Sequence, residues 1–338
     1  MKKKGIIIGF GGMGIRHQKA LASLGIQVIA ICDKNIDKLN NLKLSNVKKV
    51  SNYKNLLNLD ADIVCISSNT KSRENIIKDF LIKSSINKIL IEKPLAVSFS
   101  KCLELYKISN KLKKRKRIFV NTFRTISPNF KRIKKFFKSQ NEKVTQVFIN
   151  SPSAGLGNMG SIFFDLSNYF INDKPISVSS WIDQTGTINP RGKQFKDPGG
   201  FGVIRYKNGK KVFFDLSENT SLPYKILIKS RNMQFTIDEI NNKYHLEERP
   251  DKLRRKPDYF YLYKPTLLKL KKTEKYDVVK MTKLSIKTLF KSSGFKSNMK
   301  ESVEAMQLVF SCHASKFQSG IINIPLKKRY HNLKVNFP

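Results

Sequence analysis

Gly9-Phe10-Gly11-Gly12-Met13-Gly14 (GFGGMG) is the stretch that decides the fold of this 338-residue chain. It follows the apolar run Gly5–Gly9 (GIIIG), typical of a buried strand, and precedes Ile15–Leu24, which has a helical pattern. Its glycines suit a tight turn, a close approach of the backbone to a pyrophosphate, and close packing of the helix on the strand. The first N–H groups of such a helix are free to bind phosphate. We therefore expect residues 9–14, including Phe10, Gly12 and Met13, to bind a dinucleotide.

Asp33 strengthens this interpretation because of its distance from the glycines. It ends the second apolar run, Gln27–Cys32 (QVIAIC), about 20 residues after Gly14. A carboxylate at this place accepts hydrogen bonds from the adenosine ribose and repels a 2′-phosphate, which favours NAD over NADP. Lys34, next to it, could tolerate the phosphate. The alternative is a glycine-rich turn that binds nothing, with Asp33 as a helix cap.

The first 120 residues alternate short apolar runs with amphipathic segments. The runs predict strands at Gly5–Gly9, Gln27–Cys32, Val47–Val50, Ile63–Ser67, Lys88–Ile91 and Ile118–Asn121. The segments between them predict helices at Ile15–Leu24, Ile36–Leu44, Tyr53–Asn58, Arg73–Lys83 and Ser100–Lys113. Continuous apolar strands alternating with helices are typical of a parallel sheet covered on both faces. We expect a doubly wound α/β Rossmann domain over residues 1–121.

After Asn121 the pattern changes to alternating strands with fewer helices. Helices are predicted at Pro128–Ser139, Ser161–Ile171 and Glu301–Ser319, the last of them ended by Gly320. Strands are predicted at Val144–Asn150, Val178–Asp183, Gly202–Tyr206, Lys211–Asp215, Tyr224–Ser230 and Met233–Ile237. Asn208-Gly209 is a strong hairpin signal, and Asp251–Lys275 is basic and poorly periodic, as in a loop. We expect an α+β domain with a largely antiparallel open sheet over residues 122–338.

Composition favours a globular protein of about two domains. Hydrophobic residues make up 40% and charged residues 27%. The sequence contains no run of about 18 uncharged apolar residues, which is the length that a membrane-spanning helix needs. Glycines interrupt the apolar N-terminal stretch, so it does not match a signal peptide. The four cysteines are widely spaced and three lie in apolar runs, and the four histidines have no metal-ligand spacing. We expect a cytoplasmic protein with reduced cysteines, no metal and no membrane partner.

The net charge of +40, from 65 Lys and Arg against 25 Asp and Glu, raises the question of nucleic-acid binding. The lysines are spread along the chain among many Asn and Ile residues, as an AT-rich coding sequence would produce. The densest blocks, Lys111–Arg117 and Lys131–Lys138, adjoin helical patterns, as solvated helix faces do. We expect nonspecific, salt-sensitive attraction to polyanions and no specific nucleic-acid partner.

Glu92-Lys93-Pro94 directly follows the predicted strand Lys88–Ile91. Ligands of open parallel sheets bind beyond the carboxyl ends of the strands, so this tripeptide is expected at the rim of the cofactor cleft. A lysine ammonium there can hydrogen-bond a substrate hydroxyl and stabilise a developing alkoxide. The alternative is a Glu–Lys salt bridge on the surface.

The sequence resembles the Gfo/Idh/MocA (glucose-fructose oxidoreductase, inositol dehydrogenase and rhizopine catabolism) superfamily over nearly its whole length. The motifs that carry the resemblance are GFGGMG, Asp33, Ile63–Thr70 (IVCISSNT), Ile91–Ser98 (IEKPLAVS), Val120–Pro128 (VNTFRTISP), Gly160–Phe170 (GSIFFDLSNYF) and Glu301–Gly320. The resemblance implies a Rossmann domain, a second domain that forms the substrate wall, and an association into homo-oligomers. It also implies hydride transfer at a sugar, sugar acid, nucleotide sugar or cyclitol. Ser68, Asn69, Glu92 and Lys93 are then further cofactor-binding residues, and Lys93 is also catalytic.

The second catalytic segment of the superfamily departs from its usual pattern here. An Asp is commonly followed by a His four residues on, and the corresponding residues are Asp165 and Tyr169; in members with a His three residues before the Asp, the position is Ile162. Asp165 and Tyr169 would share a helix face, and a nearby Lys93 ammonium would lower the pKa of the tyrosine, normally near 10, to give an acid–base pair. The alternative is that Tyr169 is aromatic core.

Three further segments are candidates for binding substrate. The guanidinium of Arg124 could hold a substrate carboxylate or phosphate, or could form a structural ion pair. Asn168 lies on the same predicted helix as Asp165. The loop 191–200 could meet an anionic sugar or be a plain surface loop.

The sequence as a whole predicts an NAD-dependent, less readily NADP-dependent, dehydrogenase or reductase acting on a CH–OH group of a sugar-like substrate. Because the histidine is missing, the alternative is a member of the same fold that has lost turnover and binds dinucleotide or sugar as a sensor or partner subunit. A nucleic-acid-binding protein is the third hypothesis, and it rests on charge alone.

Overall fold

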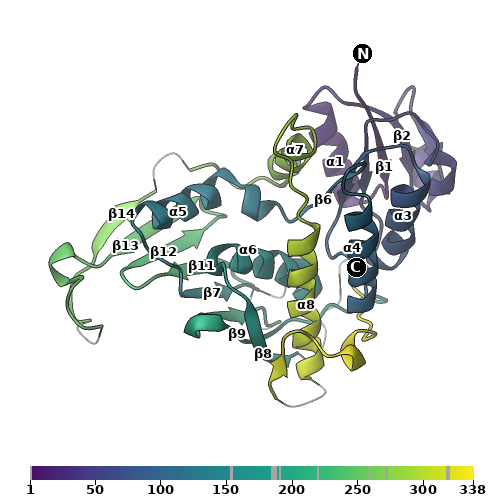
Figure 1. The fold of residues 1–338 in the computed structure, drawn as a ribbon. Helices are drawn as coiled ribbons and strands as arrows, with labels where there is room; N and C mark the ends of the chain where they lie inside the picture. The colour runs from purple at the N-terminus through teal and green to yellow at the C-terminus, as the bar shows by residue number, and fades with distance from the viewer. Residues whose placement is uncertain are drawn as a thin grey trace.

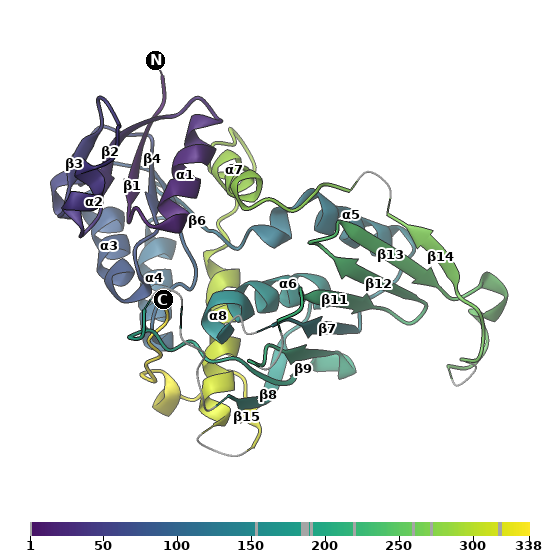
Figure 2. The ribbon, with the colours of Figure 1, turned by 180° about the vertical axis from the view of Figure 1, so that it is seen from behind.

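The computed structural model describes residues 2–152, 155–183, 189, 192–218, 221–258, 261–270, 273–316 and 320–338. These residues form two sheets with helices packed around and between them (Figures 1 and 2).

The first sheet is parallel and has the strand order β3-β2-β1-β4-β5-β6 in the described part of the chain. Its strands are β1 (Lys4–Ile8), β2 (Gln27–Cys32), β3 (Lys48–Val50), β4 (Ile63–Ile66), β5 (Lys88–Ile91) and β6 (Arg117–Val120). The helices of this part are α1 (Gly12–Ala22), α2 (Ile36–Asn40), α3 (Thr70–Lys83) and α4 (Phe99–Lys111), with a 3-10 turn η1 (Tyr53–Leu56). This order is that of a doubly wound Rossmann fold, which confirms the predicted fold class.

Burial explains why these strands form a parallel sheet. Every residue of β4 is fully buried, and β1 and β5 are buried over their last three or four residues. Strands covered on both faces have no room for alternating polar residues, which is why the sequence shows continuous apolar runs.

The second sheet is mainly antiparallel, with the order β14-β13-β12-β11-β7-β10-β9-β8-β15 in the described residues. Its strands are β7 (Gln146–Asn150), β8 (Pro175–Ile182), β9 (Gly200–Tyr206), β10 (Lys211–Asp215), β11 (Lys225–Lys229), β12 (Met233–Asp238), β13 (Lys243–Glu248), β14 (Thr266–Lys269) and β15 (Ile322–Asn323). The pairing of β7 with β10 is parallel and makes the sheet mixed. The predicted antiparallel α+β part is thereby confirmed.

The predicted hairpin at Asn208-Gly209 joins β9 to β10. Asn208 has φ 56° and Gly209 has φ 73°, so both residues take the left-handed conformation that tight hairpin turns require. The sequence signal for strands β13 and β14 is weaker than that for the hairpin, because both strands contain polar residues. The predicted loop Asp251–Lys275 is therefore wrong over β14, which pairs as an edge strand with β13.

Two helices connect the sheets through the middle of the molecule. α6 (Ser161–Ile171) and α8 (Met299–Ser315) pack on each other and against the second sheet, and α8 also packs on α4 (Figure 1). α5 (Pro128–Ser139) covers the sheet farther out, where Phe137 meets Phe235 of β12 edge to face. The predicted helix Glu301–Ser319 begins earlier, and residues 317–319 lie outside the described residues.

The helix α7 (Val278–Leu289) was not predicted. It returns from the second half of the chain to pack against α1, as both ribbon views show. Its Ile286 and Leu289 are fully buried in the same cluster as Ile7 and Leu21. A segment from beyond residue 122 thus completes the outer layer of the first sheet, and the domain boundary at 121 stays a prediction.

Cys32, Cys65, Cys102 and Cys312 are buried and free, as expected of reduced core residues. Burial raises the pKa of the Cys32 thiol to about 11 and raises those of the others further. Among the described residues, none of the helices combines the length and the apolar character that crossing a bilayer requires.

Gly14 and Gly12 provide a matched test of the turn before α1. A Cβ at Gly14 would lie 2.2 Å from the carbonyl oxygen of Gly9, whereas a Cβ at Gly12 would meet nothing within 4 Å. We expect Gly14→Ala to lower the free energy of unfolding by roughly 1–3 kcal/mol, because a backbone atom must move. Gly12→Ala should leave it unchanged or raise it by up to about 1 kcal/mol, since alanine favours a helix over glycine. Urea denaturation without cofactor measures both; equal effects would contradict the packing role of Gly14.

Candidate functional site

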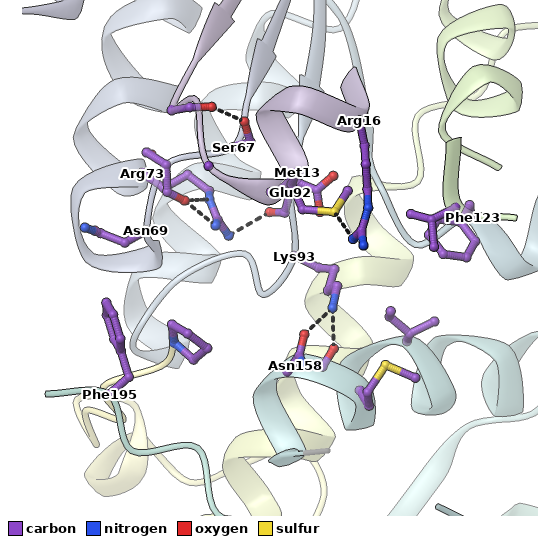
Figure 3. A pocket seen from close by; sticks show the side chains of 18 of the residues that line it. Met13, Arg16, Ser67, Asn69, Arg73, Glu92, Lys93, Phe123, Asn158 and Phe195 are labelled. Atoms are coloured by element: carbon purple, nitrogen blue, oxygen red, sulfur yellow. Dashed lines mark hydrogen bonds between the residues drawn. The ribbon is translucent and has the colours of Figure 1, made fainter. Parts of the chain in front are cut away.

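A cavity of about 620 Å³ opens beyond the carboxyl ends of β1, β4 and β5. Side chains from both halves of the chain line it (Figure 3). From the first half they include Met13, Arg16, Asp33, Asn69, Glu92, Lys93 and Phe123, and from the second half Asn158, Met159, Ile162, Phe195, Tyr276, Val278 and Pro338. The first sheet therefore presents its ligand-binding edge to a wall made by the second half of the chain.

The glycine-rich turn forms one side of this cavity. Gly9 has φ +85°, and a Cβ there would lie 2.5 Å from the backbone nitrogen of Ser68, so only glycine fits. Gly11 and Gly12 line the cavity and have nothing within 4 Å of their Cβ positions. Open glycine backbone at the start of a helix is what a pyrophosphate needs. The side chain of Phe10, by contrast, is buried in the core.

Asp33 lies where this cavity meets a second one of about 520 Å³, lined by Lys34, Asn52, Tyr53, Ser68 and Asn69 among others. One carboxylate oxygen accepts a 2.7 Å hydrogen bond from the backbone N–H of Phe10. The other accepts one of 3.1 Å from the N–H of Asn35. The cap of α2 is the side chain of Asn35, which accepts from Lys38, so Asp33 does not serve as that cap.

Glu92 joins several elements behind the cavity. Its Oε1 is 2.7 Å from Nε2 of His17 on α1, and it accepts a 2.6 Å hydrogen bond from the amide of Asn121, at the end of β6. Burial alone would raise the pKa of Glu92, but the His17 hydrogen bond and charge and the Asn121 amide outweigh it and lower the pKa to about 2. Glu92 is therefore an ionised, buried support, and the expected alternative of a surface pair with Lys93 is not found.

Lys93 turns toward the second half of the chain, as Figure 3 shows. The Lys93–Pro94 peptide bond is cis. The half-buried Lys93 Nζ donates a 3.0 Å hydrogen bond to the carbonyl oxygen of Asn158, and it also bonds the side-chain oxygen of that residue. Lys93 thus lines the same cavity as the glycine-rich turn, and its ammonium is held by the oxygens of Asn158.

Asp165, Asn168 and Tyr169 line a separate cavity of about 570 Å³. The expected meeting of Lys93 with Asp165 and Tyr169 is therefore not formed. A π-helical turn, Gly155–Gly160, precedes α6 and presents Asn158 to Lys93, and Ile162 lines the same cavity. Tyr169 lies seven residues farther along α6, a distance of about 10 Å at 1.5 Å per residue.

Tyr169 packs against an aromatic ring and a cation, which agrees with the alternative that it belongs to the aromatic core. The ammonium of Lys134 lies 3.7 Å from the centre of its ring, and Phe170 meets it edge to face. Burial raises the pKa of Tyr169, opposite to the lowering that a Lys93 neighbour would cause. Asn168 accepts a 2.7 Å hydrogen bond from the hydroxyl of the buried Tyr206.

Asp165 is buried, with one oxygen hydrogen-bonded to Thr122, and the other finds no hydrogen-bond partner among the described residues. Burial raises its pKa to about 7, opposed by the Thr122 hydrogen bond and reinforced by the charges of Glu301 and Glu304. The carboxyl group is accordingly protonated below neutral pH, away from the cavity that holds Lys93.

Arg124 forms the structural ion pair that was the alternative to substrate binding. It is 1% exposed, and its Nε lies 2.9 Å from a carboxylate oxygen of Glu239 while its Nη2 donates to the hydroxyl of Tyr224. The rings of Phe163 and Tyr276 flank the guanidinium at 5.0 and 5.5 Å. Tyr276 stands between Arg124 and the cavity, since it lines the cavity and Arg124 does not.

Arg73 is a supporting residue that no motif in the sequence singles out. It is 1% exposed, and its guanidinium donates to the carbonyl oxygens of Ser68, Glu92 and Pro94, which fixes the loops after β4 and β5 together (Figure 3). Asn158 and Tyr276 were also missed, because their places in the cavity depend on the π-helical turn and on the return of the chain to α1. Arg16 was missed too, although it lies on α1 two residues after Gly14. The predicted loop 191–200 reaches the cavity through Phe195, and Arg191 lies outside the described residues.

The described ranges contain no group of three His, Cys, Asp or Glu side chains placed to hold a metal ion. The polar groups that line the cavity include the Lys93 ammonium, the carboxylates of Asp33 and Glu92, serine hydroxyls, amides, guanidinium groups and the phenol of Tyr276.

The Rossmann part of the chain matches a known family. Residues 3–122 match the Gfo/Idh/MocA model, which describes an oxidoreductase family with an NAD-binding Rossmann fold. The resemblance seen in the sequence is confirmed over this part, and with it NAD as the cofactor of the family. No curated protein matches the chain in sequence.

Solved structures share the fold over most of the chain. An oxidoreductase from Agrobacterium radiobacter in complex with NAD+, L-tartaric acid and magnesium has a TM-score of 0.73 at 14% identity, covering 96% of this chain and 99% of that one. UDP-N-acetylglucosamine 3-dehydrogenase GnnA from Acidithiobacillus ferrooxidans has a TM-score of 0.70 at 15% identity, covering 92% and 98%. The super-repressor mutant of Gal80p from Saccharomyces cerevisiae has a TM-score of 0.73 at 14% identity, covering 96% and 98%. At these identities the likeness concerns the fold.

The burial of Asp165 predicts a loss of stability as the pH rises. Its folded pKa of about 7 lies above the ordinary value of 3.8, so the stabilisation is complete below pH 4 and is lost as the pH rises through 7. We expect Asp165→Asn to become more stable relative to wild type by about 2–3 kcal/mol between pH 5 and pH 8. Urea denaturation at both pH values measures the difference. The exposed Asp60→Asn variant is the control, and a difference that does not change with pH would show that Asp165 is ionised throughout.

Proposed function

We propose that this protein is an NAD-dependent oxidoreductase that transfers hydride at a CH–OH carbon of a sugar-like substrate. The observation that carries the proposal is that one cavity is lined by the open glycine turn, Asp33 and Lys93. The family match over residues 3–122 supports the cofactor, and the GnnA structure, a sugar dehydrogenase of the same fold, supports the substrate class.

The residues of the first half fit a dinucleotide. Gly11 and Gly12 offer open backbone at the start of α1, where a pyrophosphate would be bound by N–H groups. Asp33, between the two cavities, would accept hydrogen bonds from the adenosine ribose, and its charge disfavours a 2′-phosphate. The nicotinamide, when bound, supplies the hydride chemistry.

Lys93 is the group we propose for handling the proton of the substrate hydroxyl. Its ammonium is fixed by Asn158 within the cavity and has protons to donate to a substrate oxygen. In the direction of oxidation, the neutral amine of Lys93 would accept the hydroxyl proton and pass it to water, and in the direction of reduction the ammonium would donate a proton to the carbonyl oxygen. The ammonium beside that oxygen would also stabilise its alkoxide character. Tyr276 and Arg16 line the same cavity and offer further hydrogen bonds to a hydroxylated substrate.

A second candidate is a dinucleotide-binding sensor or partner subunit without turnover. The observation that favours it is that Lys93 is held by the neutral amide of Asn158 and that Ile162, an apolar residue, lines the cavity. Neither side chain can accept a proton from the lysine. The fold of the Gal80p super-repressor mutant is shared by this chain, which makes a regulatory use of this architecture a concrete alternative.

Asp33 provides the test of the cofactor. We expect NADH to bind more tightly than NADPH, and Asp33→Ala to weaken NADH binding by roughly tenfold or more while changing NADPH little, because hydrogen bonds to a charged group are lost. Nicotinamide fluorescence and thermal shift at moderate salt measure both affinities. The nearby exposed Asp37→Ala variant is the control. Equal affinities in wild type would contradict the role of Asp33, and no binding of either would remove the cofactor proposal.

Lys93 separates the two candidate functions. Wild-type protein is screened with NAD+ against sugars, sugar acids, nucleotide sugars and cyclitols. We expect Lys93→Ala to reduce the turnover of any substrate found by about 10²–10⁴-fold with NADH affinity retained, because proton transfer is lost. Lys107→Ala, on the exposed face of α4, should keep full turnover. Unchanged turnover in Lys93→Ala would exclude this role, and NADH binding with no turnover of any class would favour the sensor.

A further inference from the structure

Asn158 is held in place by a loop that lies about 40 residues farther along the chain and carries Asp197. Both carboxylate oxygens of Asp197 accept hydrogen bonds from the π-helical turn, one from the N–H of Gly157 at 2.7 Å and one from the N–H of Asn158 at 2.8 Å. The adjacent Pro198 carbonyl accepts from the N–H of Leu156 at 3.1 Å. Three successive N–H groups of the turn are thus satisfied by one short loop. Charge-assisted bonds to a carboxylate are stronger than neutral ones, so Asp197 is the main anchor.

Two glycines make this close approach feasible. Gly155 has φ +69°, and a Cβ on it would lie 2.3 Å from a carboxylate oxygen of Asp197. A Cβ on Gly157 would lie 2.2 Å from the ring of Phe337. The turn is therefore held between the Asp197 carboxylate and the fully buried Phe337 ring, and it has no space to shift toward either.

Asn158 is in this way fixed on both sides. Its N–H donates to Asp197, and its carbonyl and side-chain oxygens accept from Lys93 Nζ. The hydroxyl of Ser161, at the start of α6, donates 2.6 Å to the Gly157 carbonyl and closes the turn. A movement of the Asp197 carboxylate would displace Asn158, and with it the two oxygens that fix the ammonium.

The last described residues tie this loop back to the segment that follows Lys93. The carbonyl of Asn336 accepts a 2.9 Å hydrogen bond from the N–H of Lys196, and its side chain donates to the carbonyl of Gln194. The N–H of Val335 donates 3.0 Å to the carbonyl of Val97, four residues after Lys93. The segment that follows Lys93 and the loop that carries Asp197 are thus both hydrogen-bonded to residues 335–336.

We propose that Asp197 is a positioning residue that fixes the Lys93 ammonium in the cavity through Asn158. The inference rests on the proposed function, because only that function requires the Lys93 ammonium to be held at one position. The effect of Asp197 on the reactivity of Lys93 can nevertheless be measured whether or not the protein turns over a substrate.

The test measures the reactivity of Lys93 itself. Folded full-length protein is acetylated with a trace of acetic anhydride from pH 7 to 11, and the labelling of Lys93 relative to the exposed Lys107 is quantified by peptide mass spectrometry. We expect Asp197→Ala to raise Lys93 labelling by roughly two- to tenfold, the range for the loss of about one hydrogen bond, and to lower the midpoint of its pH profile. Asp197→Glu, which keeps the carboxylate, should restore part of the wild-type profile. Asp60→Asn should have no effect.

Asn158→Ala provides a second route to the same answer. It should raise Lys93 labelling as Asp197→Ala does, and the two changes together should add little to either alone, because they break one chain of contacts. If Asp197→Ala does not fold, Asp197→Asn replaces it, since it keeps the size of the side chain and removes the charge.

Three results would overturn the proposal. They are an unchanged Lys93 profile in folded Asp197 variants, an equal rise at Lys93 and Lys107, and fully additive effects of the Asp197 and Asn158 changes. Failure of the proposed function looks different: Lys93→Ala then keeps full turnover, or no substrate turns over, while the labelling of Lys93 still depends on Asp197.

Discussion

The buried carboxylate of Glu92 is the interaction on which the site depends. An ionised group in a protein core costs free energy unless every oxygen is paired. Glu92 offsets this cost through Oε1, which accepts from His17 on α1 and from Asn121 after β6, and Asn121 in turn accepts from Ser285 on α7. One charge therefore joins the helix of the glycine turn, two strand ends and the helix that returns from the second half. Because Lys93 is the next residue, its direction is set by the same network.

The predictable part of the fold is the part in which each segment carries its own pattern. The continuous apolar strands of the first sheet, the glycine turn and the Asn208-Gly209 hairpin are local signals, and the structure has all of them. β14 was missed because it is four residues long and is held as an edge strand by its pairing with β13. α7 was missed because its partners lie far along the chain: Ile286 and Leu289 meet the core beneath α1, and no local pattern marks that destination.

The candidate site also has one part that could be predicted from local sequence and one part that could not. Its cofactor side, with Gly9, Gly11 and Asp33, follows from strand–turn–helix spacing, and the structure places these residues at one cavity. The substrate side depends on a π-helical turn, which changes which residues of α6 face Lys93. The resemblance to the superfamily selected Asp165 and Tyr169, which a regular helix puts on one face, whereas Asn158 and Ile162 are at the cavity. The clue in the sequence was Gly155 and Gly157, whose lack of side chains permits the Asp197 and Phe337 contacts.

Asn158 also bears on what the site can do chemically. A carboxylate or imidazole beside Lys93 would accept its proton, whereas an amide only directs the ammonium. With Asn158 and the Asp197 loop holding it, Lys93 is suited to stabilise negative charge on a substrate oxygen and to exchange its proton with water. The cavity also offers the hydroxyl of Tyr276, whose pKa is raised by burial despite the opposing charge of Arg124. A phenol of that kind donates hydrogen bonds and does not act as a base. In the proposed function, the stabilisation of an alkoxide would fall to the Lys93 ammonium, whose position is set by Asn158 and the Asp197 loop.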